Sequence, residues 1–414
     1  MNRIHKNLSA GRWNNFSLAE QLANVGSEAG RAINWRGKNA EFSNLAAERA
    51  LELAELTISD PKNRRRLKEL TRRSDLRGAF QSCGHLALLV ITAAATWIFF
   101  AQRLWVGFAL GLFAHGTVYS FLAGLATHEL AHGTVFSTKW LNGLFVRFYS
   151  LISWFNFHDY RMSHTYHHLY TLHPRGDREV VLPTNPSLDL LFLLQLFTLN
   201  LVGTRSEPYS FPLVQNIGAT VKLAFTGRYS KEWLEAVYAD QPDAHRKSIR
   251  WARLILLFHL ALIAASIVFR LWPLPLLVAF APFIANWLRY FVGVPMHTGL
   301  RTNVTDFRLC VRSITLDPFT QFLYWRMNWH TEHHMFAAVP CYNLRNLYRA
   351  VAADLPKPRT LLGAWREMRQ IWKKQQTEPG YQFETPLPGR KAEGGKKQDT
   401  LESSLGDLAP KDLE

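Results

Sequence analysis

The chain has 414 residues, and its 48 Lys and Arg residues against 32 Asp and Glu residues give a net charge of +16. The basic residues are dispersed and form no recognised nucleic-acid-binding motif, so we expect no nucleic-acid partner, and attraction to anionic lipid headgroups or to an acidic protein fits better. Three cysteines without CxxC spacing exclude a disulfide framework and a zinc ribbon.

Residues 1–77 are a polar, basic region in which the sequence predicts three helices. Ser17 and Glu20 have the spacing of a capping box, which opens a helix through about residue 35. A second helix is predicted over 42–58, and Asp60 followed by Pro61 opens a third one, through about residue 73. We expect a cytoplasmic helical region that is either a docking module or an extension without a partner.

Four apolar stretches then indicate membrane spans, although the mean hydropathy of the whole chain is only −0.09. Each stretch lacks charged residues and is bounded by them, which is typical of a segment that crosses a bilayer. They pair as two hairpins with Arg103 and Arg270 at the turns, and three prolines are expected to cap or kink the last stretch. The four stretches are 83–101, 104–127, 254–269 and 271–288.

Charge indicates which side of the membrane the connecting segments occupy. The segment 128–253 contains thirteen Lys and Arg residues, whereas each hairpin turn has one. By the positive-inside rule, this segment and both termini are cytoplasmic. Two further apolar stretches, 141–157 and 190–204, are expected to lie in the interface, because the first contains Arg147 and the second has only fifteen residues.

Eight of the sixteen histidines lie in three short clusters, each following an apolar stretch: HELAH at 128–132, HTYHH at 164–168 and HTEHH at 330–334. On a helix, residues three or four positions apart share one face, so each cluster can direct its imidazoles at one point. Imidazole is a ligand for iron, copper, zinc and nickel. Eight neutral imidazoles are about what two metal ions need while leaving room for oxygen or substrate.

An HxxxH cluster followed by two HxxHH clusters resembles the membrane fatty acid desaturase superfamily, which includes hydroxylases and ketolases, and the resemblance covers roughly residues 80–360. It implies a non-haem di-iron oxidase with two iron ions and O2 as co-substrate. It also implies that the cluster histidines are metal ligands, with a ninth near the cytoplasmic end of the fourth span. The implied ligands are His128, His132, His164, His167, His168, His297, His330, His333 and His334.

The expected architecture is an all-α membrane protein with four transmembrane helices in two hairpins, a cytoplasmic histidine-rich di-iron cap and interfacial helices. The domains are then a helical region at 1–77, a catalytic domain at 78–375 and a disordered tail at 376–414, where apolar residues are few. The chain is thus predicted to be a multi-pass membrane protein with its histidine clusters on the cytoplasmic side.

Three carboxylates and three further histidines receive weaker predictions. Glu129 is predicted to accept a ring N–H and so orient a ligand, and Asp159 and Glu332 are predicted either to do the same or to be surface carboxylates. The three histidines lie within the apolar stretches and are expected to make packing or interhelical contacts: His85, His115 and His259.

The predicted function is oxygen-dependent desaturation of a long acyl chain, most simply in a membrane lipid. Neither an HPGG haem motif nor a GxGxxG motif is present, so we expect electrons from a separate ferredoxin, rubredoxin or cytochrome b5 type donor. A lipid, alkane or carotenoid hydroxylase or ketolase remains the alternative. HELAH also matches the HExxH of zinc metalloproteases, with Glu129 as general base, but that interpretation leaves the other two clusters unexplained. A metal carrier is a third alternative, but it would need exposed, flexible histidines, whereas these are predicted to lie on helices beside membrane spans.

Overall fold

The computed structural model of the protein describes residues 6–35, 39–177, 179–180, 187–203, 211–304 and 306–388. The described part is mostly helical and has almost no strand, which confirms the all-α prediction. The strands within it are β1 (Ile314–Thr315) and β2 (Arg359–Thr360), which pair in parallel. Of the predicted disordered tail, 376–414, the stretch 389–414 lies outside the described residues.

The amino-terminal region contains the predicted helices. Ser17 N–H donates to Glu20 Oε2 at 2.9 Å and Glu20 N–H donates to Ser17 Oγ at 3.3 Å, which is the capping box predicted from the sequence. Asp60 caps the helix that begins at Pro61 by accepting from Lys62 N–H at 2.8 Å. The elements are α1 (Lys6–Ser9), η1 (Arg12–Asn15), α2 (Leu18–Trp35), α3 (Ala40–Ser59) and α4 (Pro61–Leu70).

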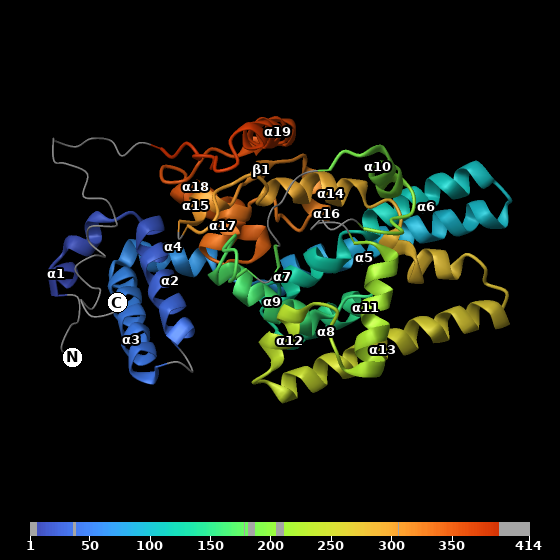
Figure 1. Ribbon diagram of the computed structural model, residues 1–414, viewed down its shortest axis with the longest axis horizontal. Coiled ribbons are helices and arrows are strands. Elements are labelled where there is room, and N and C mark those ends of the chain that lie inside the picture. Colours follow the sequence, from blue (N-terminus) through green and yellow to red (C-terminus); the bar gives the residue numbers. More distant parts are fainter. Residues whose placement is uncertain are drawn as a thin grey trace.

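This amino-terminal bundle lies beside the carboxyl-terminal helices, at the left of Figure 1. Asn343 Nδ2 donates to the carbonyl of Leu70 at 2.8 Å, and Ser74 N–H donates to Tyr342 Oη at 2.8 Å. The contacts fix the end of α4 against the segment that follows the third histidine cluster.

Three helices are long and apolar enough to cross a membrane, and each projects apolar side chains outward. They are α5 (Asp75–Ala101), α6 (Trp105–Tyr119) continued through η2 (Leu122–Ala126) and α7 (Thr127–Ala131), and α13 (Pro242–Val268). The chain reverses after α5 and after α13 at Arg103 and Arg270, which both adopt positive φ. Figure 1 shows both reversals at the same end of the molecule.

The fourth predicted span, 271–288, is interrupted as its prolines predict, and it is not among the three described helices that are long and apolar enough to cross a membrane. The chain returns from Arg270 in short pieces, because prolines in this stretch remove backbone donors and interrupt the helix. The interruption leaves backbone groups without helical partners, and residues just after α10 form hydrogen bonds with them. Asn200 N–H donates to the Phe283 carbonyl, and Ala285 N–H donates to the Thr198 carbonyl, both at 2.8 Å. The pieces are η3 (Pro275–Ala279), η4 (Ala281–Phe283), α14 (Trp287–Gly293) and η5 (Val294–Met296).

The three histidines within the apolar stretches make the interhelical contacts expected of them. His85 Nε2 lies 3.1 Å from the carbonyl of Val118, and His115 Nε2 lies 2.8 Å from that of Leu277. His259 Nε2 lies 3.0 Å from the carbonyl of Leu151 and its ring stacks on Trp154 at a centroid distance of 4.0 Å. His85 thus links the two arms of one hairpin, whereas His115 and His259 link the hairpins to neighbouring segments.

The remaining helices lie around the ends of the three long helices that are opposite the reversals at Arg103 and Arg270 (Figure 1). None of them is a candidate span within the described residues. The segments 141–157 and 190–204 contribute a helix of fourteen residues and one of eight. The remaining elements are α8 (Lys139–Ile152), α9 (Phe157–Leu169), α10 (Leu190–Phe197), α11 (Leu213–Thr226), α12 (Glu232–Tyr238), α15 (Phe307–Cys310), α16 (Pro318–Leu323), α17 (His330–Met335), η6 (Cys341–Asn343), α18 (Leu344–Val351) and α19 (Leu361–Thr377).

Candidate metal centre

The fold brings all nine predicted ligands together in two groups. Within each group, one side-chain nitrogen of every histidine lies within 4.8 Å of the others. The first group takes residues from all three clusters, and the second joins clusters two and three to the histidine that follows η5. The groups are His128, His132, His164, His168 and His333, and His167, His297, His330 and His334.

Local backbone features direct each histidine cluster toward the centre. The first lies on α7, which is turned inward by a kink where Gly124 adopts φ +74° and its N–H donates to Thr127 Oγ1 at 2.9 Å. The second lies along α9 and the third along α17, where spacings of three and four keep the imidazoles on one face. His297 follows the broken fourth stretch directly, so the break positions a ligand.

The imidazoles point their Nε2 atoms at one another. In the first group, His128 Nε2 lies 2.8 Å from His333 Nε2, and His164 Nε2 lies 2.9 Å from His168 Nε2. In the second group, the Nε2 atoms of His297 and His330 are 2.9 Å apart. Convergence of like atoms from separate helices is the arrangement that a cation requires, since only a cation satisfies several lone pairs at once.

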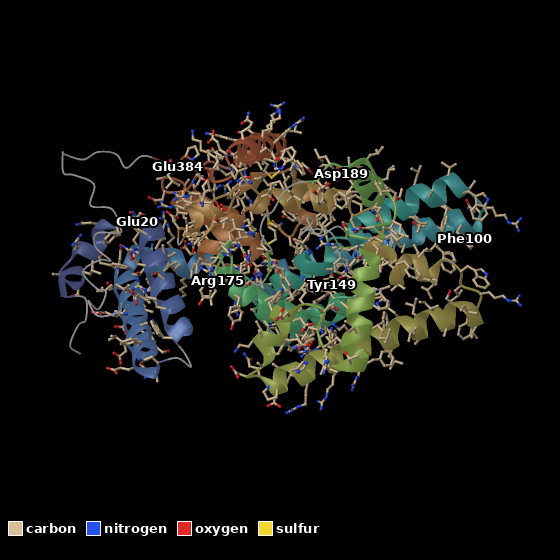
Figure 2. The ribbon with its side chains drawn as sticks, viewed as in Figure 1. Glu20, Phe100, Tyr149, Arg175, Asp189 and Glu384 are labelled. Atoms are coloured by element: carbon tan, nitrogen blue, oxygen red, sulfur yellow. The ribbon has the colours of Figure 1, made fainter. Side chains whose placement is uncertain are left out.

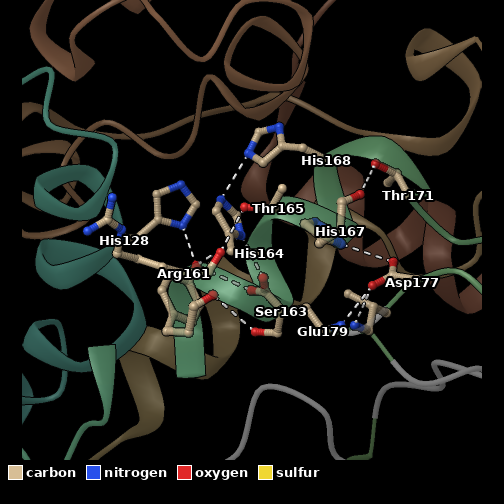
Figure 3. Close-up of polar contacts among 12 residues, drawn as sticks. His128, Arg161, Ser163, His164, Thr165, His167, His168, Thr171, Asp177 and Glu179 are labelled. Carbon is tan, nitrogen blue, oxygen red and sulfur yellow. Dashed lines mark hydrogen bonds and ion pairs between the residues drawn. The ribbon is translucent and has the colours of Figure 1, made fainter. Parts of the chain in front are cut away.

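Outward ring nitrogens are held by partners from α9 and the loop after it, as Figure 3 shows. His128 Nδ1 lies 2.6 Å from Tyr160 Oη, and His164 Nδ1 lies 2.6 Å from Glu179 Oε2. His167 Nδ1 lies 2.9 Å from Asp177 Oδ2. Such contacts fix the ring orientation and direct the Nε2 lone pair toward a metal.

Two members of the second group are held by other parts of the chain. Thr171 Oγ1 lies 3.1 Å from His334 Nδ1, and the carbonyl of Cys310 lies 3.1 Å from His297 Nδ1. Tyr160, Thr171, Asp177 and Glu179 were not identified from the sequence. The signal that could have found Asp177 and Glu179 is the polar stretch HPRGDRE, which follows the second cluster within a turn-rich segment.

Burial keeps most of these imidazoles neutral, the form that binds metals. It lowers the pKa of His132 to about 4 and that of His297 to about 3. Burial alone would raise the pKa of Asp177, but the His167 imidazole and two backbone N–H groups outweigh it, so the pKa lies below its ordinary value. His167 is the exception: burial alone would lower its pKa, but the carboxylates of Glu179 and Asp177 outweigh burial and raise it.

The three carboxylates singled out from the sequence have different positions. Glu129 is buried, with Oε1 3.5 Å from His333 Nδ1. Glu332 Oε2 accepts from Ser313 Oγ at 2.6 Å, and burial raises the pKa of Glu332 to about 7. Asp159 accepts from three hydroxyl groups. Neither Asp159 nor Glu332 bonds to a histidine of the two groups among the described residues.

Asp159 instead connects α9 to the helices across from it. Its Oδ1 accepts from Tyr229 Oη at 3.1 Å, from Tyr238 Oη at 2.9 Å and from Ser248 Oγ at 2.5 Å. Tyr229 precedes α12 and Tyr238 is its last residue, and their rings stack on each other. The carboxylate therefore holds α12 and α13 against the helix that carries the second histidine cluster.

This contact predicts a pH-dependent contribution to stability. Burial raises the pKa of Asp159 to about 6, although the three hydroxyl donors lower it. Between pH values of about 4 and 6 the folded protein then binds more protons than the unfolded chain, so stability falls as the pH rises. We expect wild type to lose thermal stability relative to Asp159→Asn across this window, measured as the unfolding midpoint in detergent. A constant difference between the two proteins would contradict the assignment.

A cavity of about 650 Å³ borders both histidine groups. Histidines from each group line it together with residues of α11, α12 and α13. Figure 2 draws the side chains of these helices on the ribbon. The aromatic segment before the third cluster contributes Tyr324 and Met327 to this lining, while Phe319 is exposed. The histidines that line the cavity are His128, His164, His167, His297 and His330.

The donor chemistry of the site fits two transition-metal ions. Nine imidazoles, with carboxylates only in supporting positions, suit iron, copper or zinc and are unsuited to magnesium or calcium. Buried Nδ1 atoms of His330 and His333 and Oε1 of Glu129 have no hydrogen-bond partner within the described part of the chain. The atoms that bound metal ions would satisfy are instead the Nε2 lone pairs that converge within each group.

Comparison with known families gives one match. The model of the family described as "Fatty acid desaturase" matches residues 103–364, which include all nine histidines. No curated protein matches the chain.

Proposed function

Because the chain belongs to the fatty acid desaturase family, we propose that it is an oxygen-dependent di-iron oxidase that introduces a double bond into a long acyl chain. The family makes the protein an oxidoreductase, and its three apolar helices indicate a membrane protein. The observation that carries the proposal is the convergence of nine histidines, from three separate helices and the residue after η5, on two adjacent points beside one cavity.

The two histidine groups would each hold one iron ion. Bound iron supplies activation of dioxygen and removal of hydrogen from an unactivated C–H bond. The chain's own residues position the reactants: Asp177, Glu179 and Tyr160 fix the imidazole rings, and the cavity wall holds an acyl chain beside them. Holding the reacting carbon in one place contributes to the rate because it removes the entropy cost of alignment.

We place the histidine clusters and both termini on the cytoplasmic side. Thirteen Lys and Arg residues in the segment 128–253, against one at each hairpin turn, support this orientation. The two reversals at Arg103 and Arg270 then lie on the opposite side. On the cytoplasmic side the chain would receive electrons from a separate ferredoxin, rubredoxin or cytochrome b5 type protein, and its net charge of +16 favours an acidic partner.

Hydroxylation or ketone formation by the same centre is the alternative outcome, since desaturation and hydroxylation share the first hydrogen removal and differ in the step after it. The zinc protease alternative has less support. His128 and His132 of HELAH share their group with three histidines from the other two clusters, whereas a single-zinc site would leave those without a role.

Product analysis tests the proposal. We expect host cells that express the protein with an electron donor to accumulate unsaturated acyl chains only when oxygen is present, and we expect His164→Ala to abolish them. Isotopically labelled dioxygen separates the alternatives, because an alkene retains no label whereas an alcohol retains one labelled oxygen atom. Identical lipid profiles for the wild type and the variant, with donor supplied, would contradict oxidation of acyl chains.

A further inference from the structure

The cavity beside the histidines is not lined only by apolar residues. Two cationic side chains line it: Lys231, an exposed residue just before α12, and Arg289 on α14. An acyl chain alone needs no cation along its path, so these charges indicate that a further group enters the cavity. Two carboxylates, Asp159 and Glu179, also line it.

Arg289 lines the cavity from the same stretch of chain as His297, a predicted metal ligand. Arg289, Gly293 and His297 are spaced by four residues along α14 and η5, and all three line the cavity. The guanidinium carbon lies 5.4 Å from the ring centroid of Phe211. A Cβ atom at Gly124 would lie 3.4 Å from Arg289 Nη2, so the guanidinium approaches the kink that carries the first histidine cluster.

Among the described residues, Arg289 makes no hydrogen bond and no ion pair, although its side chain is half-buried. The two cavity carboxylates are engaged elsewhere: Asp159 accepts from three hydroxyl groups and Glu179 pairs with His164. Burial lowers the pKa of Arg289 only to about 10, so the side chain is charged at neutral pH.

An uncompensated guanidinium in a partly buried cavity is costly, and a neighbouring pair of bound cations would increase that cost. An oxyanion removes the penalty, and the planar fork of arginine matches a carboxylate with two parallel hydrogen bonds. The aromatic face of Phe211 restricts the guanidinium plane, which leaves its edge free to donate into the cavity.

We propose that Arg289 binds the carboxylate of the acyl substrate, so that the site accepts a free fatty acid and sets the oxidised position by its distance from the carboxyl end. The inference rests on the proposed function for the acyl chain itself, and it narrows the substrate to chains whose anionic group enters the cavity. The interaction is non-covalent and requires no further reactant.

Binding tests this assignment without relying on turnover. Labelled palmitate, its methyl ester and 1-palmitoyl lysophosphatidate are titrated against purified wild type, Arg289→Gln and Arg289→Lys in detergent. We expect wild type to bind palmitate about tenfold or more tightly than the ester, since charge-assisted hydrogen bonds contribute at this level. Arg289→Gln should bind both equally, and Arg289→Lys should lie between them.

Lys231→Gln is the matched control, because it removes the other cation that lines the same cavity. It should retain the preference for palmitate over the ester. Loss of that preference in Lys231→Gln but not in Arg289→Gln would overturn the assignment, as would equal binding of acid and ester by wild type. Tighter binding of lysophosphatidate than of palmitate would replace the carboxylate by a phosphate and would also overturn it.

Iron content, measured on the same samples, separates this inference from the proposed function. Arg289→Gln should retain wild-type iron, which also shows that it is folded. If wild type contains no iron but still prefers palmitate through Arg289, the oxidase proposal fails and the carboxylate site stands. With active enzyme, acids of different chain length should be oxidised at the same number of carbons from the carboxyl group.

Discussion

Replacing His297 by alanine is expected to remove one metal ion and abolish oxidation, even though this histidine lies outside the three clusters. Its group contains only four imidazoles, against five in the other, so one deletion leaves three donors from α9 and α17. We expect iron to fall to about one ion per chain and activity to fall by more than the ~100-fold that loss of an outer contact causes.

The matched control is His158→Ala, which removes a histidine from α9 that belongs to neither group. Its ring packs on Phe157, so its loss should leave iron content at the wild-type level. Elemental analysis and oxygen-dependent product formation measure both variants. Wild-type iron and activity in His297→Ala would show that the second group is not a metal site.

Replacing Asp177 by asparagine is expected to weaken iron binding by about 10- to 100-fold, the usual loss when an outer partner of a ligand is removed. Its Oδ2 contacts His167 Nδ1 and accepts from Leu172 N–H, while its Oδ1 accepts from the N–H groups of Glu179 and Val180. Both carboxylate oxygens face donors, but an asparagine has only one acceptor oxygen. Its NH2 group would therefore meet the donors on one side and lose the hydrogen bonds there.

Asp159→Asn provides the comparison, because it makes the same substitution at another carboxylate that lines the cavity. Among the described residues Asp159 bonds only to hydroxyl groups, so this variant should retain wild-type iron affinity. Competition with a chelator measures both. Equal iron retention by the two variants would mean that the contact to His167 does not support metal binding.

The sequence predicted the features that local patterns encode. A capping box and an aspartate before a proline define the ends of α2 and α4, and spacings of three and four place each cluster on one helix face. Uncharged stretches located the three long helices. Each of these depends on residues within one or two helical turns, so a single sequence suffices.

Features that depend on distant parts of the chain were not predicted. Prolines predicted an interruption of the fourth apolar stretch, but nothing in its own sequence reveals that residues 198–200 satisfy its freed backbone groups. Asp177 and Glu179 reach the histidines only because the loop after α9 turns back on that helix. Arg289 reaches the cavity because α14 follows that break, while Asp159 lies on α9 near the second cluster yet faces α12 and α13.

Metal content of the purified wild-type protein tests the central proposal most directly. The arrangement of nine histidines in two groups predicts about two iron ions per chain, one for each group. One zinc ion and no iron would contradict a di-iron centre and would return HELAH to the zinc-site alternative.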